Sequence, residues 1–417
     1  MEKQLIEQLQ TIQSASRKLI AISDDQKKKI LNEVADLALA KENVILEANQ
    51  RDLDRMDPAD PKYDRLLLNP ARLQSITNDM RRVAELPNPL GEILDEHVKE
   101  NGLRIARVSV PIGVIGVVYE SRPNVTFDVF ALTFKTGNAC VLKGSRDAAD
   151  SNEAIVSVIQ EVLSKYGLED TVLLAPAERE ALPVILTAEG LVDCIIPRGS
   201  QGLIDFVRKN ASIPVIETGA GIVHTYVDAA ADLNKAKSIV QNAKTRRVSV
   251  CNALDCLIIH KDRLIDLPAI VSGMDETYDV EIHADQLSYA ALQSSYDQKL
   301  LLAAGAEDYG IEWLSHKMSI KVVDSLNEAL DHIAQYSSKH SEAIVSENLE
   351  TVELFLQQVD AACVYANAST AFSDGGEFGL GAEIGISTQK LHARGPMGLR
   401  EITSYKWVVR GDGQVRS

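Results

Sequence analysis

The sequence predicts an α/β protein with two doubly wound domains, in which helices cover both faces of a mostly parallel sheet. Short β-rich runs alternate with helical runs from residue 112 to 228, and a second block of this kind extends to about residue 366. The length of 417 residues allows two or three domains rather than one core. The composition, 45% hydrophobic and 25% charged, is that of a globular chain and excludes disorder.

The N-terminal segment is helical in pattern. Within residues 1–56 apolar side chains recur at intervals of three and four, which predicts two amphipathic helices. A loop at 57–63 and a further helix should follow.

A β-hairpin should come next. Extended stretches at 93–99 and 103–110 flank Asn101-Gly102, a dipeptide that favours a type I′ turn. The C-terminal segment SYKWVVRGDG is typical of one more short strand. Hairpin and strand would each leave an unpaired edge, so we expect both to pair outside their own domains in an oligomer. Residues 93–110 and 400–415 are therefore a predicted oligomerisation arm of a homodimer or homotetramer.

The first doubly wound domain follows the hairpin. Its ligands should bind outside the carboxyl ends of its strands. Strands are expected at 112–119, 139–143, 171–174, 193–196, 214–216 and 223–227, and helices at 124–136, 151–165, 178–188 and 201–209. In the second block, 320–323 should be a strand and 326–336 a helix.

Charge and cysteine content exclude several classes of protein. The 43 basic and 60 acidic residues give a net charge of −17 without a basic stripe, so we expect neither a nucleic-acid nor a membrane partner. The five cysteines are scattered and lack metal-ligand spacing, which predicts neither a disulfide framework nor a metal site. Because the N-terminal segment also lacks the pattern of a signal peptide, we expect a soluble, cytoplasmic protein.

Three residues could carry acyl transfer. Cys251 lies between polar Ser and Asn neighbours in RRVSVCNALD, although a lone cysteine is more often a small buried apolar residue. Glu217 ends an apolar run and is followed by Gly219 and Gly221, which would allow close backbone approach to a ligand. Asn124 opens a predicted helix. A thiolate, a carboxylate and an amide donor are what thioester chemistry requires.

The segments YESRPNVT, NACVLKGSRDA, ETGAG, HTYVD, SVCNAL and STQKLHARGPMGLREITSYKW resemble those of the γ-glutamyl phosphate reductase family, within the aldehyde dehydrogenase superfamily. The likeness covers residues 10 to 412 in the family's order and spacing. It implies an aldehyde dehydrogenase-like fold, with an NADP-binding domain at 1–92 and 111–222 and a catalytic domain at 223–395.

The resemblance also implies roles for single residues. Cys251 matches the nucleophile, and Asn124 the side-chain oxyanion donor that acts with the Cys251 backbone N–H. Glu217 matches the general base of hydrolytic relatives; here such a base would waste the thioester, so we expect a structural or proton-balancing role. For the cofactor, the matches are Lys143 at the adenosine ribose, Gly199 and Ser200 at the pyrophosphate, and Glu312 at the nicotinamide ribose.

The implied reaction is an attack of the thiolate on an acyl phosphate, loss of phosphate, and reduction of the thioester to the aldehyde by NADPH. NADP(H) is favoured over NAD(H) because Gly144, Ser145 and Arg146 follow Lys143, with no acid before Asp147. Arg146 could instead be a solvated loop cation.

An amino-acid substrate that carries phosphate would attract cations. Candidates are Arg122, Arg246, Arg247, Lys390, His392 and Arg394. Each could equally form a surface salt bridge, except in the segment 390–398, whose small, basic and kinked residues favour a loop that contacts an anion. A separate kinase would supply the acyl phosphate, so transient contact with glutamate 5-kinase is a further hypothesis. The alternatives are an oxidative aldehyde dehydrogenase for a small semialdehyde and a catalytically silent NADP-binding protein.

Overall fold

The computed structural model of this chain describes residues 1–60 and 62–416, which form two compact units. Unit 1 comprises Met1–Thr218, Gly379–Gly385 and the C-terminal segment from Met397. Unit 2 comprises Gly219–Phe378 and Ile386–Pro396. In the described part of the chain, none of the helices combines the length and apolar character that a bilayer crossing requires.

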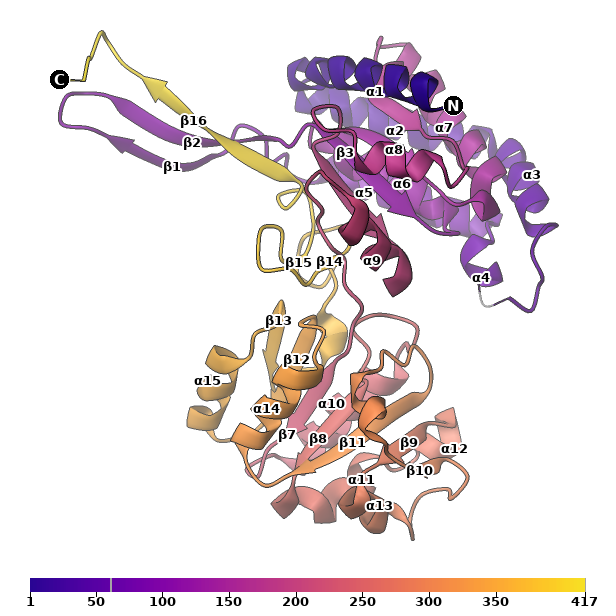
Figure 1. The fold of residues 1–417 in the computed structure, drawn as a ribbon, viewed down its shortest axis with the longest axis vertical. Helices are drawn as coiled ribbons and strands as arrows, with labels where there is room; N and C mark the ends of the chain where they lie inside the picture. Colours follow the sequence, from indigo (N-terminus) through magenta and orange to yellow (C-terminus); the bar gives the residue numbers. More distant parts are fainter. Residues whose placement is uncertain (61, 417) are drawn as a thin grey trace. The chain divides into compact units, whose positions relative to one another are not determined.

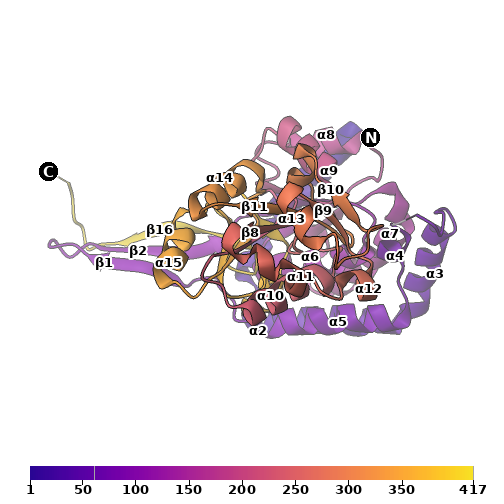
Figure 2. The ribbon, with the colours of Figure 1, turned by 90° about the horizontal axis from the view of Figure 1, so that it is seen from below.

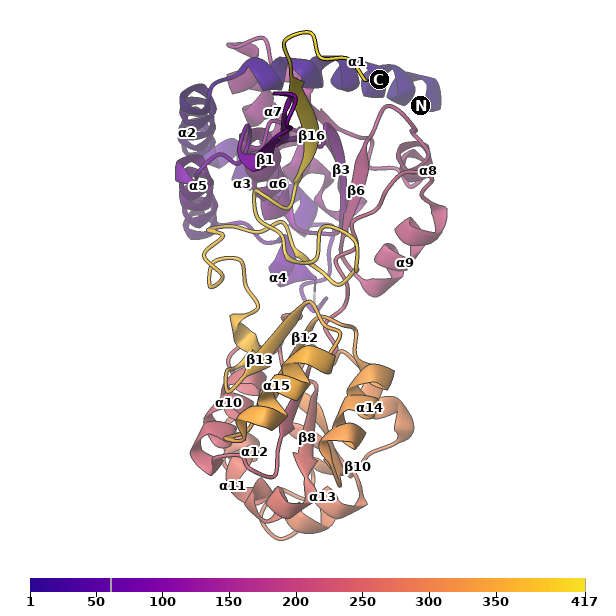
Figure 3. The same ribbon diagram turned by 90° about the vertical axis from the view of Figure 1, so that its left-hand side faces the viewer.

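Unit 1 begins with helices. The prediction of two helices in residues 1–56 is wrong, because the segment contains three. Ser23 starts the second of them with a capping box, and non-helical Lys41, with φ −103° and ψ 22°, separates it from the third. Figure 3 shows α2 and α5 side by side. The helices are α1 (Glu2–Ser16), α2 (Asp24–Ala40), α3 (Glu42–Leu53), α4 (Tyr63–Leu66) and α5 (Pro70–Glu85), with a 3₁₀ turn at Arg17–Ala21.

The described part of unit 1 contains a parallel sheet of four strands in the order β5-β4-β3-β6. The helices α6 and α7 pack together on one face, and α8 covers the other with α1. The strands are β3 (Val114–Tyr119), β4 (Ala139–Lys143), β5 (Val172–Leu174) and β6 (Cys194–Arg198). The helices are α6 (Pro123–Lys135), α7 (Ala149–Ser164), α8 (Ala181–Leu186) and α9 (Gln201–Asn210).

The predicted hairpin is confirmed: β1 (Ile93–Val98) pairs with β2 (Arg104–Pro111). The prediction of a type I′ turn is wrong. Of the two central residues, Asn101 and Gly102, only Gly102 has positive φ, at 85°. Asn101 instead accepts the Leu103 N–H with its side chain at 3.2 Å, which gives a longer turn with glycine in the left-handed position.

The C-terminal strand β16 (Thr403–Arg410) pairs with β2, from Thr403 opposite Pro111 to Arg410 opposite Arg104. The expectation that hairpin and strand are unpaired within the chain is therefore wrong, since they pair with each other. Figure 2 shows the three strands extending away from the helices of unit 1.

Unit 2 contains a parallel sheet of seven strands among the described residues, in the order β10-β9-β11-β8-β7-β12-β13. They are β7 (His224–Val227), β8 (Cys256–His260), β9 (Glu281–Ala284), β10 (Leu301–Ala303), β11 (Lys317–Val323), β12 (Ser341–Val345) and β13 (Cys363–Ala366). The helices are α10 (Leu233–Thr245), α11 (Leu267–Ile270), α12 (Met274–Tyr278), α13 (Gln286–Leu292), α14 (Leu326–Tyr336) and α15 (Leu349–Gln358).

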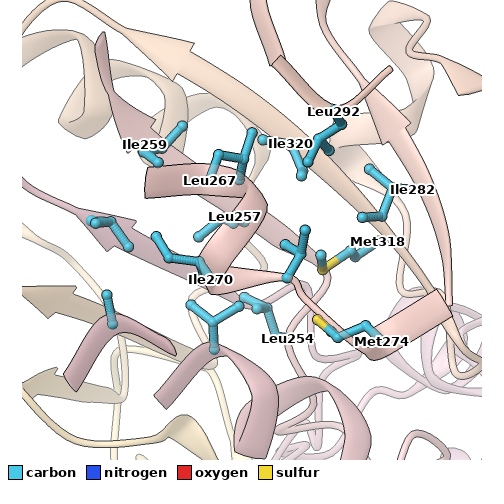
Figure 4. Close-up of a cluster of buried hydrophobic side chains, with 14 of the residues drawn as sticks. Leu254, Leu257, Ile259, Leu267, Ile270, Met274, Ile282, Leu292, Met318 and Ile320 are labelled. Carbon is cyan, nitrogen blue, oxygen red and sulfur yellow. The ribbon is translucent and has the colours of Figure 1, made fainter. Parts of the chain in front are cut away.

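Alternation along the strands divides the core of unit 2 between the two faces of this sheet. Leu257 and Ile259 of β8 pack with α10, α11 and α13, in the cluster that Figure 4 shows with Leu267, Ile270 and Leu292. Cys256 and Ile258 of the same strand pack against α14 and α15. Figure 1 shows these two layers of helices. The predicted doubly wound architecture is therefore present. However, the strand expected at 223–227 belongs to the sheet of unit 2 and not to the first domain, and 214–216 forms only an isolated bridge, at Val215.

Candidate active site

Cys251 lies in the loop between α10 and β8, at the amino end of the parallel strands of unit 2. It is half-buried, whereas Cys140, Cys194, Cys256 and Cys363 are buried. Burial raises the pKa of the Cys140, Cys194 and Cys256 thiols to about 12, which keeps them protonated and unreactive. Cys251 is thus the cysteine with access for a substrate.

Gly221 lies against the backbone of Cys251. A Cβ placed on Gly221 would lie 1.6 Å from the Cys251 carbonyl oxygen, so only glycine fits. A Cβ on Gly219 would meet Thr388 Oγ1 at 2.4 Å. The sequence suggested that these glycines allow close approach to a ligand. In the structure they allow close approach to other residues of the protein.

Asn252, the neighbour of Cys251, is held to a turn after β13. Its side-chain amide donates to the carbonyl oxygen of Ser373 at 2.9 Å, and its own carbonyl accepts the Thr370 hydroxyl at 2.8 Å. Since Asn252 is buried, these bonds fix the main chain next to the sulfur.

Glu312 comes before β11, at the same end of the sheet. Its Oε1 accepts the Gly221 N–H at 2.8 Å. The structure therefore joins Glu312 to the glycine that contacts Cys251, so these three residues lie together in unit 2.

Asn124 is on the first turn of α6, in unit 1. Its Nδ2 donates to Asp128 Oδ2, one turn later, at 3.2 Å. Burial raises the pKa of Asp128 to about 6, opposed by this hydrogen bond and by the charge of Arg198. Asp128 thus orients the amide. Arg122 is the N-cap of α6.

Glu217 is also in unit 1, after β6. Its Oε2 lies 3.7 Å from a guanidinium nitrogen of Arg208 on α9. Arg208 is thus the charged partner that the structure places beside Glu217.

The segment after β4 lines a cavity of about 530 Å³. Gly144, Ser145 and the 175–177 segment contribute to its wall, at the carboxyl ends of β4 and β5, as expected for a doubly wound domain. Lys143 donates to the carbonyl oxygens of Gly144 and Ala177 at 2.9 and 3.2 Å, and burial lowers its pKa. Exposed Arg146 lies 3.9 Å from Glu180.

Glu120 lies at the turn formed by Gly199 and Ser200. It accepts the backbone N–H and the hydroxyl of Ser200 at 3.0 and 2.8 Å. A carboxylate thus faces the start of α9, where backbone N–H groups favour an anion.

Lys390 and Arg394 meet one carboxylate. Both lie within 2.9 Å of Asp360, which Lys339 approaches at 3.2 Å. Hydrogen bonds from Arg394 and Lys390 hold the pKa of Asp360 far below its usual range. His392 lies exposed between them in sequence. Three cations around one carboxylate leave an excess of positive charge.

Under α14, His224, Cys256 and His332 form a buried cluster whose ligand atoms lie within 4.8 Å of one another. Burial lowers the pKa of His332 to about 3, so the neutral ring can accept the Cys256 thiol, 3.6 Å away. His224 Nδ1 contacts Glu342 at 3.1 Å. Hydrogen bonds therefore account for most of the contacts within this cluster. The spacing of the cysteines in the sequence did not predict the cluster.

Comparison with known proteins decides the family. The chain is 58% identical over 413 residues to "Gamma-glutamyl phosphate reductase" of Chlorobaculum parvum, covering 99% of this chain and 98% of that protein. It is 59% identical over 406 residues to the protein of that name in Bacteroides thetaiotaomicron, covering 97% of each. No protein-family model matches the sequence.

The chain belongs to the γ-glutamyl phosphate reductase family. A crystal structure of γ-glutamyl phosphate reductase from Thermotoga maritima matches with a TM-score of 0.95 and 41% identity over 99% of this chain and 100% of that one. An acetylating aldehyde dehydrogenase from Geobacillus thermoglucosidasius matches with a TM-score of 0.68 and 16% identity, over 100% and 98% of the two chains. This family member therefore has the predicted aldehyde dehydrogenase-like fold.

Several residues of the site in this family member were not predicted from the sequence. Asp128 could have been found, because it lies four residues after Asn124 on a predicted helix and must share its face. Glu120, Asn252 and Asp360 gave no comparable signal. Their partners lie 80, 121 and 34 residues away in the chain.

Proposed function

We propose that this protein reduces L-glutamyl 5-phosphate to L-glutamate 5-semialdehyde with release of phosphate, the second step of proline biosynthesis from glutamate, through a thioester at Cys251. The observation that carries the proposal is the identity of 58% over essentially the full length of γ-glutamyl phosphate reductases. The half-buried position of Cys251, among cysteines that are otherwise buried, supports its role as the nucleophile.

In the proposed reaction, the Cys251 sulfur forms a bond to the acyl carbon while the bond from that carbon to the phosphate oxygen breaks. The negative charge that develops on the acyl oxygen needs fixed donors, and losing one such donor typically costs ~10²–10³ in rate. Asn124 and the Cys251 backbone N–H are the proposed donors. The hydrogen bonds of Asn252 and the contact with Gly221 hold the Cys251 main chain in place for this purpose.

Glu217 keeps its proposed structural or proton-balancing role. Its pairing with Arg208 supports that role, because the carboxylate is held in an ion pair within the protein. Glu217→Gln should therefore retain more activity than Cys251→Ala.

NADP(H) is the proposed cofactor and, when bound, supplies the hydride. The residues after β4 fit its adenosine end. Ser145, which lines the cavity of about 530 Å³, has a buried hydroxyl without a hydrogen-bond partner among the described residues. Lys143 and Arg146 are the proposed contacts of the ribose and its 2′-phosphate, Gly199 and Ser200 of the pyrophosphate, and Glu312 of the nicotinamide ribose. Comparing KM for NADPH and NADH in Arg146→Glu tests this choice of cofactor.

The excess positive charge around Asp360 supports Lys390 and Arg394 as proposed contacts of an anionic substrate group. His392 and Arg122 complete the proposed set of substrate contacts.

We also propose that the strands β1, β2 and β16 are an oligomerisation arm. The protein is further proposed to work in the cytoplasm and to contact glutamate 5-kinase transiently, from which it would receive the acyl phosphate.

One assay tests the function. Phosphate-dependent reduction of NADP⁺ is measured with glutamate semialdehyde and with propanal, for the unmodified protein, Cys251→Ser and the matched control Cys194→Ala. The expected result is activity with glutamate semialdehyde that requires phosphate, is lost in Cys251→Ser and persists in Cys194→Ala. Equal activity with propanal, or without phosphate, would favour an oxidative aldehyde dehydrogenase instead.

A further inference from the structure

Asp255 connects three segments of unit 2 through one carboxylate. It lies between the Cys251 loop and β8 and is 3% exposed. Its Oδ1 accepts the Trp313 N–H at 2.9 Å, and its Oδ2 accepts the Val223 N–H at 3.2 Å. Each donor is close in sequence to a residue of the candidate site, since Trp313 follows Glu312 and Val223 comes two residues after Gly221. The backbone of Asp255 also donates to the Val223 carbonyl at 3.0 Å.

Lys244 ties the same loop to α10. Its side chain is fully buried, and its Nζ donates to the Leu254 carbonyl at 2.9 Å, while the Leu254 N–H donates to the Ala243 carbonyl at 3.0 Å. The Cys251 loop is therefore held to α10 at one end and to the Glu312 segment at its junction with β8.

The charges of Lys244 and Asp255 depend on each other. Burial lowers the pKa of Lys244 and raises that of Asp255, and in each case the opposite charge of the partner counteracts the shift. The charge of Glu312 acts on Asp255 in the same direction as burial. A buried pair of charges adds little net stability compared with apolar residues. Stability therefore does not explain why Lys244 and Asp255 lie between two residues of the candidate site.

We propose that Asp255 and Lys244 are positioning residues that fix the Cys251 sulfur relative to Glu312. They act through the Cys251 loop, the 221–223 segment and the 312–313 segment. The inference rests on the proposed function, since it takes Cys251 as the nucleophile and Glu312 as a cofactor contact. A displacement of about 1 Å between reacting groups can cost on the order of 100-fold in rate, so a small relaxation of this network should affect turnover.

The test uses Asp255→Asn, Asp255→Glu and Lys244→Met in the full chain. Lys27→Met of α2 is the matched control, because Lys27 is equally buried and also donates to a main-chain carbonyl, that of Lys135 at 3.3 Å. Each variant is compared for melting temperature, kcat, KM for NADP⁺ and the rate at which iodoacetamide alkylates Cys251. The alkylation rate reports on the sulfur itself and needs neither substrate nor cofactor.

Asp255→Asn should lower kcat by at least about tenfold, raise KM for NADP⁺ and change the alkylation rate, because its amide group cannot accept both N–H bonds. Lys244→Met should resemble it, and Asp255→Glu should recover part of kcat by restoring the charge. Lys27→Met should lower the melting temperature and leave kcat and alkylation unchanged.

The inference is overturned if Asp255→Asn and Lys244→Met lower only the melting temperature while kcat, KM and alkylation match the unmodified protein. That result would leave the proposed function intact. Should Asp255→Asn fail to fold, the same criteria apply to Lys244→Met and Asp255→Glu. The failure of the proposed function has a different signature, which is turnover that survives in Cys251→Ser.

Discussion

Gly221 shows at the scale of one residue how closely the backbone surrounds the proposed nucleophile. Because a Cβ there would lie 1.6 Å from the Cys251 carbonyl oxygen, Gly221→Ala must displace the loop, and we expect kcat to fall about 100-fold or more. Steady-state assays measure this loss. Gly202→Ala is the control, since a Cβ at Gly202 meets nothing within 4 Å. A Gly221→Ala enzyme within about tenfold of the unmodified rate would contradict the account.

Asp128 should control the pH profile through Asn124. Since the pKa of Asp128 is raised to about 6, its carboxylate is present above that pH and is lost as pH falls through it. Activity should therefore decline below about pH 6 as the charged acceptor of the Asn124 amide disappears. In Asp128→Asn, kcat should be lower throughout and this decline absent. An unchanged acid limb in Asp128→Asn refutes the role of Asp128.

Apart from the family resemblance, sequence reasoning found single residues only where a local pattern marked them. Cys251 stands out because a polar Ser and Asn lie beside it between apolar runs, and Asn124 because it opens a predicted helix after a strand. Asp255 has no such mark in ALDCLI, and its importance comes from N–H donors 32 and 58 residues away in the chain. A buried carboxylate that bridges segments becomes recognisable only when the fold brings its donors together.

At the scale of elements, predictions that rest on local periodicity were the most accurate. The strand at Ala139–Lys143 and the helix at Leu326–Tyr336 have the predicted bounds. The predicted type of the hairpin turn was wrong. The type depends on whether Asn101 adopts positive φ or accepts a hydrogen bond with its side chain, and the structure has the hydrogen bond. The pairing of β16 with β2 joins segments about 300 residues apart, which no local pattern encodes.

The strand β16 presents Tyr405, Trp407 and Val409 on one face, with 51%, 54% and 54% of their surfaces exposed. If this face is an interface between copies of the chain, Trp407→Glu should dissociate the oligomer, because it would bury an unpaired charge. Light scattering during size-exclusion chromatography measures the mass. Lys406→Glu, on the opposite face, should leave the mass unchanged, and equal masses for all three proteins would refute the arm.

At the scale of the whole molecule, the division into units departs from the expected domain limits in physically understandable ways. The segment Gly379–Gly385 belongs to unit 1, where Gly381 packs against Leu86 and Ile384 donates to the Met397 carbonyl at 2.8 Å. These contacts link segments distant in sequence, so a linear division of the chain could not place them.

Buried histidines should make the fold sensitive to acid. Burial lowers the pKa of His340 to about 4, whereas an unfolded histidine titrates near 6.5. The unfolded state therefore binds the proton more tightly, so stability is complete above about pH 6.5 and is lost as pH falls toward 4, by about 3 kcal/mol for this group. Urea unfolding at pH 7 and 4.5 should show a smaller loss in His340→Phe than in the unmodified protein. Exposed His97→Gln should keep the full loss, and identical losses in all three proteins would contradict this assignment.

In the proposed reaction the acyl group passes through the sulfur of Cys251. Mass spectrometry of protease-digested protein, after incubation with glutamate semialdehyde and NADP⁺ in the absence of phosphate, tests it most directly. We expect a hydroxylamine-sensitive glutamyl adduct on the peptide that contains Cys251. The adduct should be absent in Cys251→Ser, which should also lack turnover. An adduct on another residue, or turnover in Cys251→Ser, would contradict it.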